Sequence, residues 1–500
     1  MQMEIKQQKP DRADTLRRTA WLLVAIGGMA AVLALDISPS LSPLGQAMLA
    51  VLIFSVTIWV SGAVGFAESS LYVIVVMALL AAFTPDPAKP GDLLGSRQGL
   101  VMALSGFDSD AWAQVTAAFF IASAAKLTRL GDRLGLWVMS LVGTGPCRML
   151  AGVLAMCYVM ELFIPSPTGV VVLVVALLQK VMEVNGIRRG SNLAKGMMLA
   201  VAFGTATASI GILTSNAPAI QTANLIVEAT GREISWLRWF LYGEPFGIAL
   251  GLALYGLILL LFPPGKDYTP SRPESMKSQL SAMGPLSGPE KRLLTVLSAA
   301  ILMWASSGLL HPLNNSTVAI MAAAAIFLPG MGIGGWREVS RQVDWGVLML
   351  YGTSVSMGQW ILKSGAAAWV ANNTLVAMGF HQLPPVVSIT LLVAVFSVFA
   401  LFFSARAAAV AALVPTAIGF AASFPGGPAN LAGISLISYY TLQTTAILPM
   451  HHPMAMVTYA TGNFTSREMG LVGVFMILIQ IALTGLFIST YWRLTGLVGF

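Results

Sequence analysis

The chain has 500 residues, of which 56% are hydrophobic and only 10% are charged, and its mean hydropathy is +0.78. Apolar runs recur along its whole length, and the longer ones approach the roughly 20 residues that a helix needs to cross a bilayer. This pattern predicts an all-α polytopic membrane protein and excludes a string of soluble domains. The net charge of +7 does not indicate nucleic-acid binding, because membrane topology explains much of the basic excess.

The basic residues concentrate before the first apolar run and in a polar segment at the middle of the chain. They are Lys6, Lys9, Arg12, Arg17 and Arg18, and then Lys266, Arg272, Lys277, Lys291 and Arg292. The positive-inside rule places both segments on the cytoplasmic side. Residues 19–35 are expected to be a retained span, because the acidic residues before them are not typical of a signal peptide. We therefore expect a multi-pass protein of the inner (cytoplasmic) membrane with a cytoplasmic N-terminus.

The apolar runs, taken in chain order, predict full or partial spans. They lie near 19–35, 44–65, 69–84, 111–126, 149–165, 169–183, 196–214, 245–262, 293–309, 317–329, 345–362, 384–403, 406–423, 433–450 and 470–490. Several are too short to cross, and broken or re-entrant segments occur at membrane depth only where protein or a watery cavity satisfies the backbone. In secondary transporters, paired interrupted segments in two halves indicate the substrate site.

The two halves of the chain share Ser, Trp and Pro positions in the same order. The pairs are Trp59 and Trp304 (245 residues apart), Trp112 and Trp345 (233), Ser166 and Ser404 (238), and Pro218 and Pro453 (235). Each half is expected to hold an odd number of crossings, which predicts two inverted repeats with re-entrant hairpins. The expected organisation is an N-terminal segment with the first span (1–40), a first repeat (41–262), a cytoplasmic linker (263–285) and a second repeat (286–500).

At these motifs the chain resembles the divalent anion:sodium symporter family, within the wider ion transporter superfamily. The likeness extends from Leu41 to Tyr491 and is carried by "LSPLGQAMLAVLIFSVTIWVSGAVGFAESSLYVIVVMALL", "DWGVLMLYGTSVSMGQWILKSG" and "MAMVTYATGNFTSREMGLVG". The resemblance implies a homodimer in the lipid bilayer. Each protomer would have a fixed scaffold and a transport domain that moves as an elevator.

The chain departs from the two Ser-Asn-Thr tripeptides that define this family. The first hairpin tip reads Ser166-Pro167-Thr168 and the second reads Ser404-Ala405-Arg406. In the family each Asn helps to coordinate sodium and contacts the substrate, and a Ser or Thr four positions earlier is another sodium ligand. Those earlier positions are Leu162 and Ala400 here. Sodium is a hard cation that takes oxygen ligands, and the side chains of Pro, Ala and Leu offer none.

Arg406 is the cation of an otherwise apolar stretch, residues 401–420. A charged side chain at the bilayer centre costs roughly 2.5 to 3.5 kcal/mol, so it indicates a functional site. We expect Arg406 to supply the positive charge that sodium supplies in the symporters, with a planar guanidinium suited to carboxylate or sulfonate. The alternatives are a structural arginine at a helix start or an ion pair with Glu161. Glu161 is also a candidate proton carrier, or an acid at the membrane boundary.

The second pair of loops carries Ser215, Asn216, His451 and His452. By the resemblance, Asn216 and His451 fall where the family has substrate-contacting hydroxyls. A histidine titrates near neutral pH, so the pair would contact substrate or sense pH; the alternative is a satisfied or interfacial pair. No further ligands at metal spacing accompany it, and neither a metal nor a cofactor is expected.

These residues predict a secondary active transporter of small organic anions, di- or tricarboxylates or related sulfonates. Exchange is the expected mode, because a fixed Arg leaves the empty site charged and an empty charged site crosses the membrane badly. The alternatives are a sodium- or proton-coupled anion symporter, a cation/proton antiporter or arsenite permease of the same superfamily, and an anion channel. No catalytic motif indicates an enzyme.

Overall fold

The computed structural model describes residues 12–35, 39–86, 89, 91–142, 145–264, 274–331, 333–424 and 427–499. The basic residues Lys6, Lys9, Lys266 and Arg272 lie outside these ranges. Across the described ranges the chain is helical, with two isolated β-bridges and no strand.

The helices of the first half, with one short 3-10 turn (η1), begin and end as follows. They are α1 (Arg12–Ala34), α2 (Pro43–Ser61), α3 (Phe66–Ala82), α4 (Gly95–Leu104), η1 (Ser105–Asp108), α5 (Asp110–Thr128), α6 (Leu130–Val142), α7 (Pro146–Phe163), α8 (Pro167–Val184), α9 (Asn192–Ala208), α10 (Ala217–Thr230), α11 (Trp236–Leu261) and, in the linker, α12 (Glu274–Ala282).

The second half follows in a similar order. Its elements are α13 (Gly288–Ser306), α14 (Asn315–Ile326), α15 (Trp336–Ser340), α16 (Trp345–Lys363), α17 (Ala366–Ala371), the π turn η2 (Asn372–Val376), the 3-10 turn η3 (Phe380–Gln382), α18 (Pro385–Ala400), α19 (Arg406–Ala421), α20 (Gly427–Thr444), the 3-10 turn η4 (Pro449–His451), α21 (Pro453–Ala460), α22 (Ser466–Ser489) and α23 (Tyr491–Leu494).

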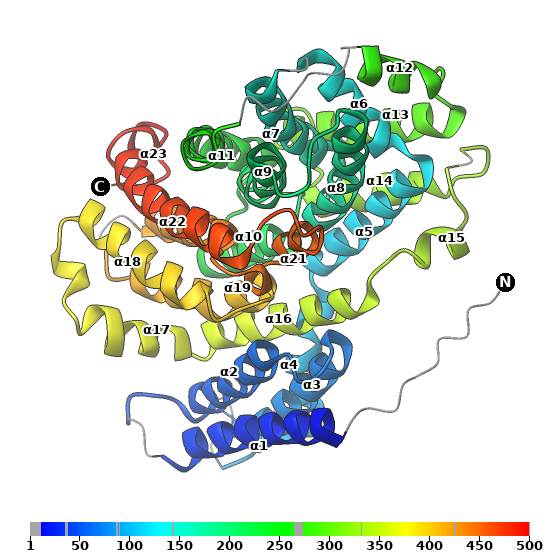
Figure 1. Cartoon of the computed structure of the whole chain (residues 1–500). Coiled ribbons are helices and arrows are strands. Elements are labelled where there is room, and N and C mark those ends of the chain that lie inside the picture. Colours follow the sequence, from blue (N-terminus) through cyan, green and yellow to red (C-terminus); the bar gives the residue numbers. More distant parts are fainter. Residues whose placement is uncertain are drawn as a thin grey trace.

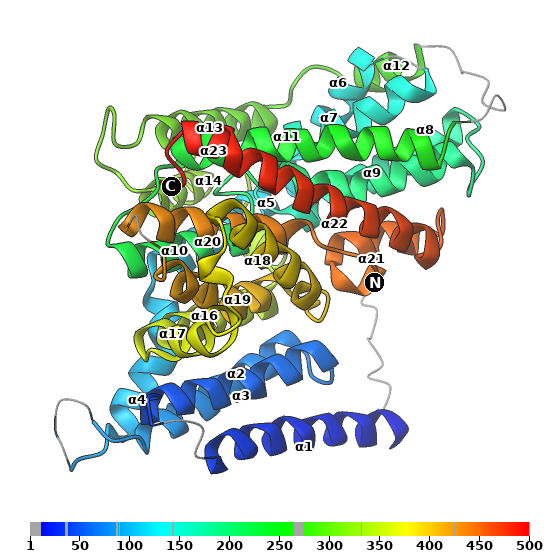
Figure 2. The same cartoon turned by 90° about the vertical axis from the view of Figure 1, so that its left-hand side faces the viewer.

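Helices α1 to α4 form a group at one side of the molecule, and α16 and α17 lie between this group and the remaining helices (Figures 1 and 2). Helix α16 packs on α2 and α3 with one side and on α19 with another. η1 approaches α16 closely because residue 106 is a glycine. A Cβ atom on Gly106 would lie 2.1 Å from the carbonyl oxygen of Gly352 in α16. The group is therefore joined to the rest of the protein through α16.

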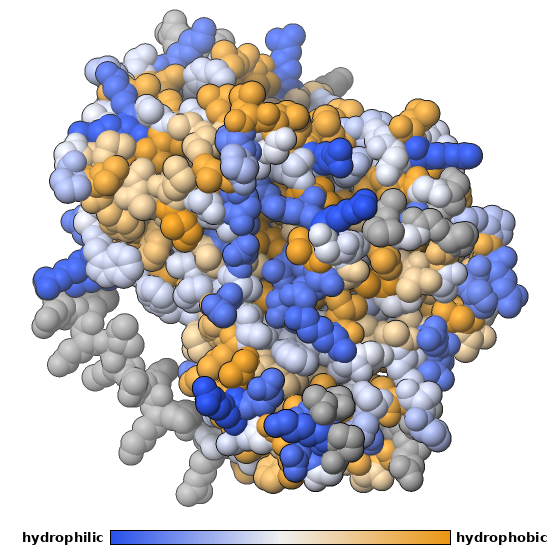
Figure 3. All heavy atoms as spheres, turned by 180° about the vertical axis from the view of Figure 1, so that it is seen from behind, coloured by the Kyte–Doolittle hydropathy of each residue, from blue (hydrophilic) through white to orange (hydrophobic). Residues whose placement is uncertain are grey.

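Helices of membrane-spanning length confirm the all-α polytopic prediction. Within the described residues α1, α2, α7, α8, α11 and the α22–α23 segment are long and apolar enough to cross a membrane, and α3, α14, α18 and α19 are shorter apolar helices. Hydrophobic areas alternate with hydrophilic ones on the rear face (Figure 3), and large apolar side chains such as Leu252, Leu260 and Leu302 are exposed. Lipid is the solvent that such a surface fits.

The helices that contain or directly follow the paired sequence positions occur in the same order in both halves. The pairs are α2 with α13, α5 with α16, α8 with α19 and α10 with α21. Ser42 caps α2 and Ser287 caps α13, each with a proline in the first turn. Pro is tolerated there because its missing N–H has no partner inside the helix. This order is what the predicted repeat requires, and the repeat boundaries and their inversion stay predictions.

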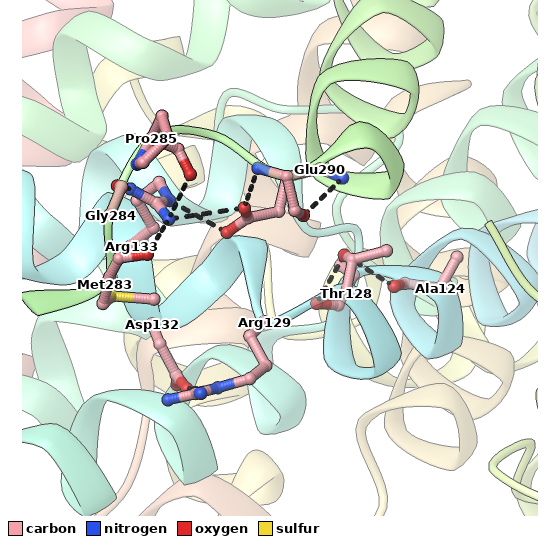
Figure 4. A network of polar contacts seen from close by, with 11 residues as sticks. Ala124, Thr128, Arg129, Asp132, Arg133, Met283, Gly284, Pro285 and Glu290 are labelled. Atoms are coloured by element: carbon pink, nitrogen blue, oxygen red, sulfur yellow. Dashed lines mark hydrogen bonds and ion pairs between the residues drawn. The ribbon is translucent and has the colours of Figure 1, made fainter. Parts of the chain in front are cut away.

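Arg133 of α6 joins the two halves at the start of α13 (Figure 4). Its Nε donates to Glu290 Oε1 (2.9 Å), and its guanidinium also donates to the carbonyl oxygens of Met283, Gly284 and Pro285. Glu290 accepts from the Ser287 N–H and completes a capping box. Glu290 precedes the span expected at 293–309. Burial alone would raise its pKa, but hydrogen bonds from Arg133 and Ser287 outweigh this and lower it.

Replacing Glu290 with Gln is expected to lower the unfolding temperature of the detergent-solubilised protein at neutral pH. Hydrogen bonds to a charged group are worth roughly 1.5 to 3 kcal/mol each. Because the folded-state pKa is lowered, this stabilisation is present above the unfolded-state pKa and is lost as pH falls through the folded-state pKa. The difference between wild type and Glu290→Gln should therefore shrink on acidification. A difference that is constant with pH, or one equal to that of the exposed control Glu183→Gln, would contradict this assignment.

Candidate functional site

Four helices begin at one cavity of about 460 Å³. They are α8, α10, α19 and α21, which lie near the centre of Figure 1. The residues of these helix starts that line the cavity are Ser166, Pro167, Thr168, Asn216, Ala217, Pro218, Ala405, Arg406, Ala407, His452 and Pro453. Each helix N-terminus carries roughly half an elementary positive charge on unpaired N–H groups. Four of them around one cavity make an environment that attracts anions.

The first tip is the turn between α7 and α8. Ser166 is the N-cap of α8, and its Oγ accepts from the backbone N–H of Gly169 (3.2 Å). Pro167 follows in the first helical turn, where its fixed φ suits the helix. Thr168 is exposed and lines the cavity. Ser166 and Pro167 therefore start α8 here. At the tip the Ser166 hydroxyl is used by the cap, and the Thr168 hydroxyl is exposed.

The second tip is the turn between α18 and α19, and Arg406 is the first residue of α19. Its side chain is only 5% exposed. The guanidinium donates to three backbone carbonyl oxygens, those of Ala400 (3.3 Å), His451 (2.8 Å) and Thr445. Its Nε has no hydrogen-bond partner within the described protein. The expected alternative of an ion pair with Glu161 is not realised, because neither carboxylate oxygen of Glu161 has a partner there.

The loop between α9 and α10 is held by hydrogen bonds around Asn216. Its Oδ1 accepts from the Ala219 N–H (2.9 Å) and so caps α10, while its Nδ2 donates to Ser215 Oγ (2.8 Å) and Tyr439 Oη (3.0 Å). Ser215 in turn donates to the Ser209 carbonyl (3.1 Å). Ser215 and Asn216 both line the cavity. These bonds fix the wall of the cavity before any ligand arrives.

The histidine pair divides into a turn residue and a cavity residue. His451 Nδ1 accepts from the N–H groups of Ile447 and Leu448 (3.2 Å each), so its ring closes the turn before α21. His452 lines the cavity, and its Nδ1 accepts from the Met454 N–H (3.4 Å) at the start of α21. In a neutral imidazole the other nitrogen then carries the proton. That Nε2 is buried and has no partner within the described residues.

Two of the predicted substrate-binding residues lie away from the cavity lining. Ser404 Oγ donates to the Trp59 carbonyl (3.5 Å), and His451 contributes its backbone carbonyl to Arg406. Neither is among the residues that line the cavity. In the described ranges no group of three or more His, Cys, Asp or Glu side chains could hold a metal ion.

Part of the cavity lining was not predicted from the sequence. One face of α5 contributes to it through Val115, Ala118, Phe119, Ala122, Ser123 and Lys126, a spacing of three and four residues that keeps side chains on one side of a helix. Lys126 stands at the end of this face and was not among the predicted site residues. Gln443 of α20 also lines the cavity and donates to Ser209 Oγ (2.9 Å). The three- and four-residue spacing along α5 was the one sequence feature that could have indicated this part of the lining.

Comparison with known proteins places this architecture among anion transporters. The model of the sodium:sulfate symporter transmembrane region matches residues 16–498. A membrane protein of Cupriavidus necator is 32% identical over 477 residues, covering 95% of this chain and 93% of the relative. The sodium-dependent dicarboxylate transporter SdcS of Staphylococcus saprophyticus is 22% identical, over 88% of this chain and 85% of its own length.

A solved structure shows the same fold. The Alcanivorax borkumensis YdaH transporter superposes with a TM-score of 0.53 at 16% identity, covering 86% of this chain and 98% of that one. The relatives and the fold are those of transporters, not of enzymes. This chain therefore belongs to the divalent anion:sodium symporter family of membrane transporters.

Proposed function

We propose that the protein exchanges small organic anions, di- or tricarboxylates or related sulfonates, across the inner membrane without sodium. It acts as a homodimer with elevator-type transport domains and a cytoplasmic N-terminus. The observation that carries this proposal is the position of Arg406. Its guanidinium lies at the cavity, bonded to three backbone carbonyl oxygens and to no carboxylate of the described chain.

The three carbonyls come from three segments that meet at the second tip. Ala400 ends α18, Thr445 follows α20, and His451 ends η4. Converging carbonyl oxygens are the ligands that hard cations take. Here the guanidinium occupies that place with geometry suited to carbonyl acceptors. The site thus contains a covalently attached cation, and a soluble one is not needed to balance the substrate.

Permanent charge favours exchange over uptake by an empty carrier. Arg is always protonated, so the unloaded site keeps its positive charge. Moving an unbalanced charge through the bilayer costs several kcal/mol. A bound anion cancels this charge, so the loaded carrier crosses and the empty one does not. A symporter, in contrast, releases its sodium and returns empty.

The donors around the cavity support an anionic substrate with more than one acidic group. Arg406 and His452 both line the cavity, and each has a buried nitrogen without a partner in the described residues; Thr168 adds a hydroxyl. Lys126 provides a second cation in the cavity lining. Small-molecule pockets typically have volumes of about 300 to 1,000 Å³, so 460 Å³ accommodates a di- or tricarboxylate. The likeness to a dicarboxylate transporter supports the same class.

Counterflow in proteoliposomes tests the proposal. Vesicles are preloaded with one unlabelled di- or tricarboxylate, sulfate or sulfonate, and entry of a labelled anion is followed in choline or sodium buffer. We expect entry only into vesicles that contain a substrate anion, at equal rates in both buffers. Sodium-dependent entry into empty vesicles would establish a symporter instead, and electrical currents far above carrier turnover would establish a channel.

Lys126 is expected to discriminate between anions by charge. Replacing it with Gln should raise KM for dianions about tenfold, as for the loss of roughly 1.4 kcal/mol of binding, and should change KM for monoanions little. Initial rates of exchange for a matched mono- and dianion measure this. Lys180→Gln, an exposed substitution on α8, is the control. Equal effects of Lys126→Gln on both anions would show that Lys126 does not contact the second acidic group.

A further inference from the structure

Two buried acids behind the cavity have no role in the proposed exchange. Glu161 of α7 is 1% exposed, and neither of its carboxylate oxygens has a partner in the described protein. Glu244 of α11 is also buried, with its carboxyl against the backbone N–H of Gly211 and its Oε2 unpartnered. The two acids are close enough for their charges to interact. Glu161 is therefore adjacent to a second acid rather than to Arg406.

The groups around this pair are neutral or acidic. The titratable side chains are Cys157 and Tyr158 of α7 and Tyr439 and Tyr440 of α20. Helix α9 contributes the hydroxyls of Thr205 and Thr207, which bond to Cys157 and Tyr158. Tyr440 is fully buried, and its hydroxyl has no partner within the described residues. Across those residues neither acid has a Lys, Arg or His at ion-pair distance.

An ionised carboxylate in such surroundings is unfavourable. Its desolvation costs several kcal/mol, and no cation offsets this cost. Two neighbouring carboxyls repel each other when both are charged, and such pairs bind protons jointly. The residues around the two acids pack closely, so the ligand that fits there is a proton. A Cβ atom on Gly211 would lie 2.4 Å from Glu244 Oε2, and neither acid is among the residues that line the cavity.

The acid pair lies next to a hydrogen-bonded part of the cavity wall. Glu161 is near enough to Tyr439 for the two groups to interact electrostatically, and the hydroxyl of Tyr439 is bonded to the side chain of Asn216 at the cavity. Glu244 packs against Gly211, in the loop that ends at Asn216. A change of charge on either acid therefore reaches the cap of α10, which forms part of the cavity wall.

We propose that Glu161 and Glu244 form a proton-binding site that is occupied in this conformation and empties when the pair meets water in another conformation of the transport cycle. A proton from water on one side forms an O–H bond with a carboxylate oxygen, and that bond breaks when the proton leaves to water on the other side. The proton then accompanies the anion, so its role in transport rests on the proposed anion exchange. Proton binding itself does not depend on that exchange.

Infrared spectroscopy of the purified protein tests proton binding without any substrate. The carboxylic-acid C=O stretch of buried acids is recorded over a pH series. We expect a band that persists at neutral pH, is lost in Glu161→Gln and weakens in Glu244→Gln, and is unchanged in the exposed control Glu183→Gln. Gln resembles a protonated Glu in size and polarity, so the fold is expected to be kept. A wild-type spectrum without this band would overturn the proposal.

Proton movement in proteoliposomes tests the coupling. With a pH-sensitive dye inside the vesicles and the same anion on both sides, an imposed pH gradient should collapse faster during exchange than without the anion, in wild type and in Glu183→Gln. Exchange should move no protons in Glu161→Gln, and its rate should no longer depend on pH. Proton movement that persists in Glu161→Gln would overturn the coupling, and so would an effect of sodium that Glu161→Gln abolishes, because the pair would then bind sodium. If no anion is exchanged while the infrared band behaves as expected, the proposed function fails and the proton site stands.

Discussion

Replacing Arg406 with Ala is expected to abolish entry of labelled anion in counterflow. The substitution removes the charge that faces the cavity and leaves three carbonyl oxygens without their donor. Deleting a buried contact with an anion costs several kcal/mol of binding free energy, which lowers the affinity more than a hundredfold. Counterflow at saturating internal anion measures the loss, and size-exclusion chromatography with thermal unfolding verifies that the protein is folded.

Two further measurements separate loss of charge from loss of structure. Arg406→Lys keeps the charge but not the planar fork, so we expect a folded protein with weak exchange. Guanidinium ions added to Arg406→Ala should restore part of the exchange, because they carry the deleted donors into the space that the substitution vacates. Exchange at the wild-type rate by a folded Arg406→Ala variant would contradict a role of Arg406 in anion binding.

Replacing Asn216 with Ala is expected to lower both the unfolding temperature and the exchange rate. The variant loses the cap of α10, worth about 1 kcal/mol, and the bonds to Ser215 and Tyr439. Each buried polar group that is left unpaired costs about 1 to 3 kcal/mol more. Thermal unfolding and counterflow measure the two losses. The exposed Asn373→Ala is the control and should match wild type.

Asn216→Asp tests the electrostatic part of this account. A carboxylate still accepts the Ala219 N–H and keeps the cap, but it adds a negative charge to the wall of an anion site. We expect an unfolding temperature closer to wild type than that of Asn216→Ala, together with a large loss of anion affinity. Unchanged affinity in Asn216→Asp would mean that the anion does not bind near the start of α10.

Much of the fold could be predicted because its signals are local. Apolar length predicted the helices. The tip residues were found through their spacing in the two halves and the family resemblance. Arg406 stood out because a cation in an apolar run is costly. These inferences needed no knowledge of which helices pack together.

The remaining part of the site depends on tertiary contacts. Helices such as α9 and α19 are buried on nearly all sides, so their hydrophobic patterns do not tell which face meets the cavity. Lys126 is distant in sequence from the tips and was indistinguishable from a solvated helix end. Glu161 was predicted beside Arg406 as one alternative, and the packing of α7 and α11 brings it near Glu244 instead. His451 and His452 are adjacent in sequence, yet the turn before α21 separates their roles.

Anion affinity of the purified protein with and without sodium tests the central claim most directly. Isothermal titration with an anion that gives counterflow is carried out in choline buffer and again in sodium buffer of equal ionic strength. Because Arg406 occupies the place of a soluble cation, the same Kd is expected in both buffers. A Kd that falls tenfold or more, about 1.4 kcal/mol, when choline is replaced by sodium would contradict this account of Arg406.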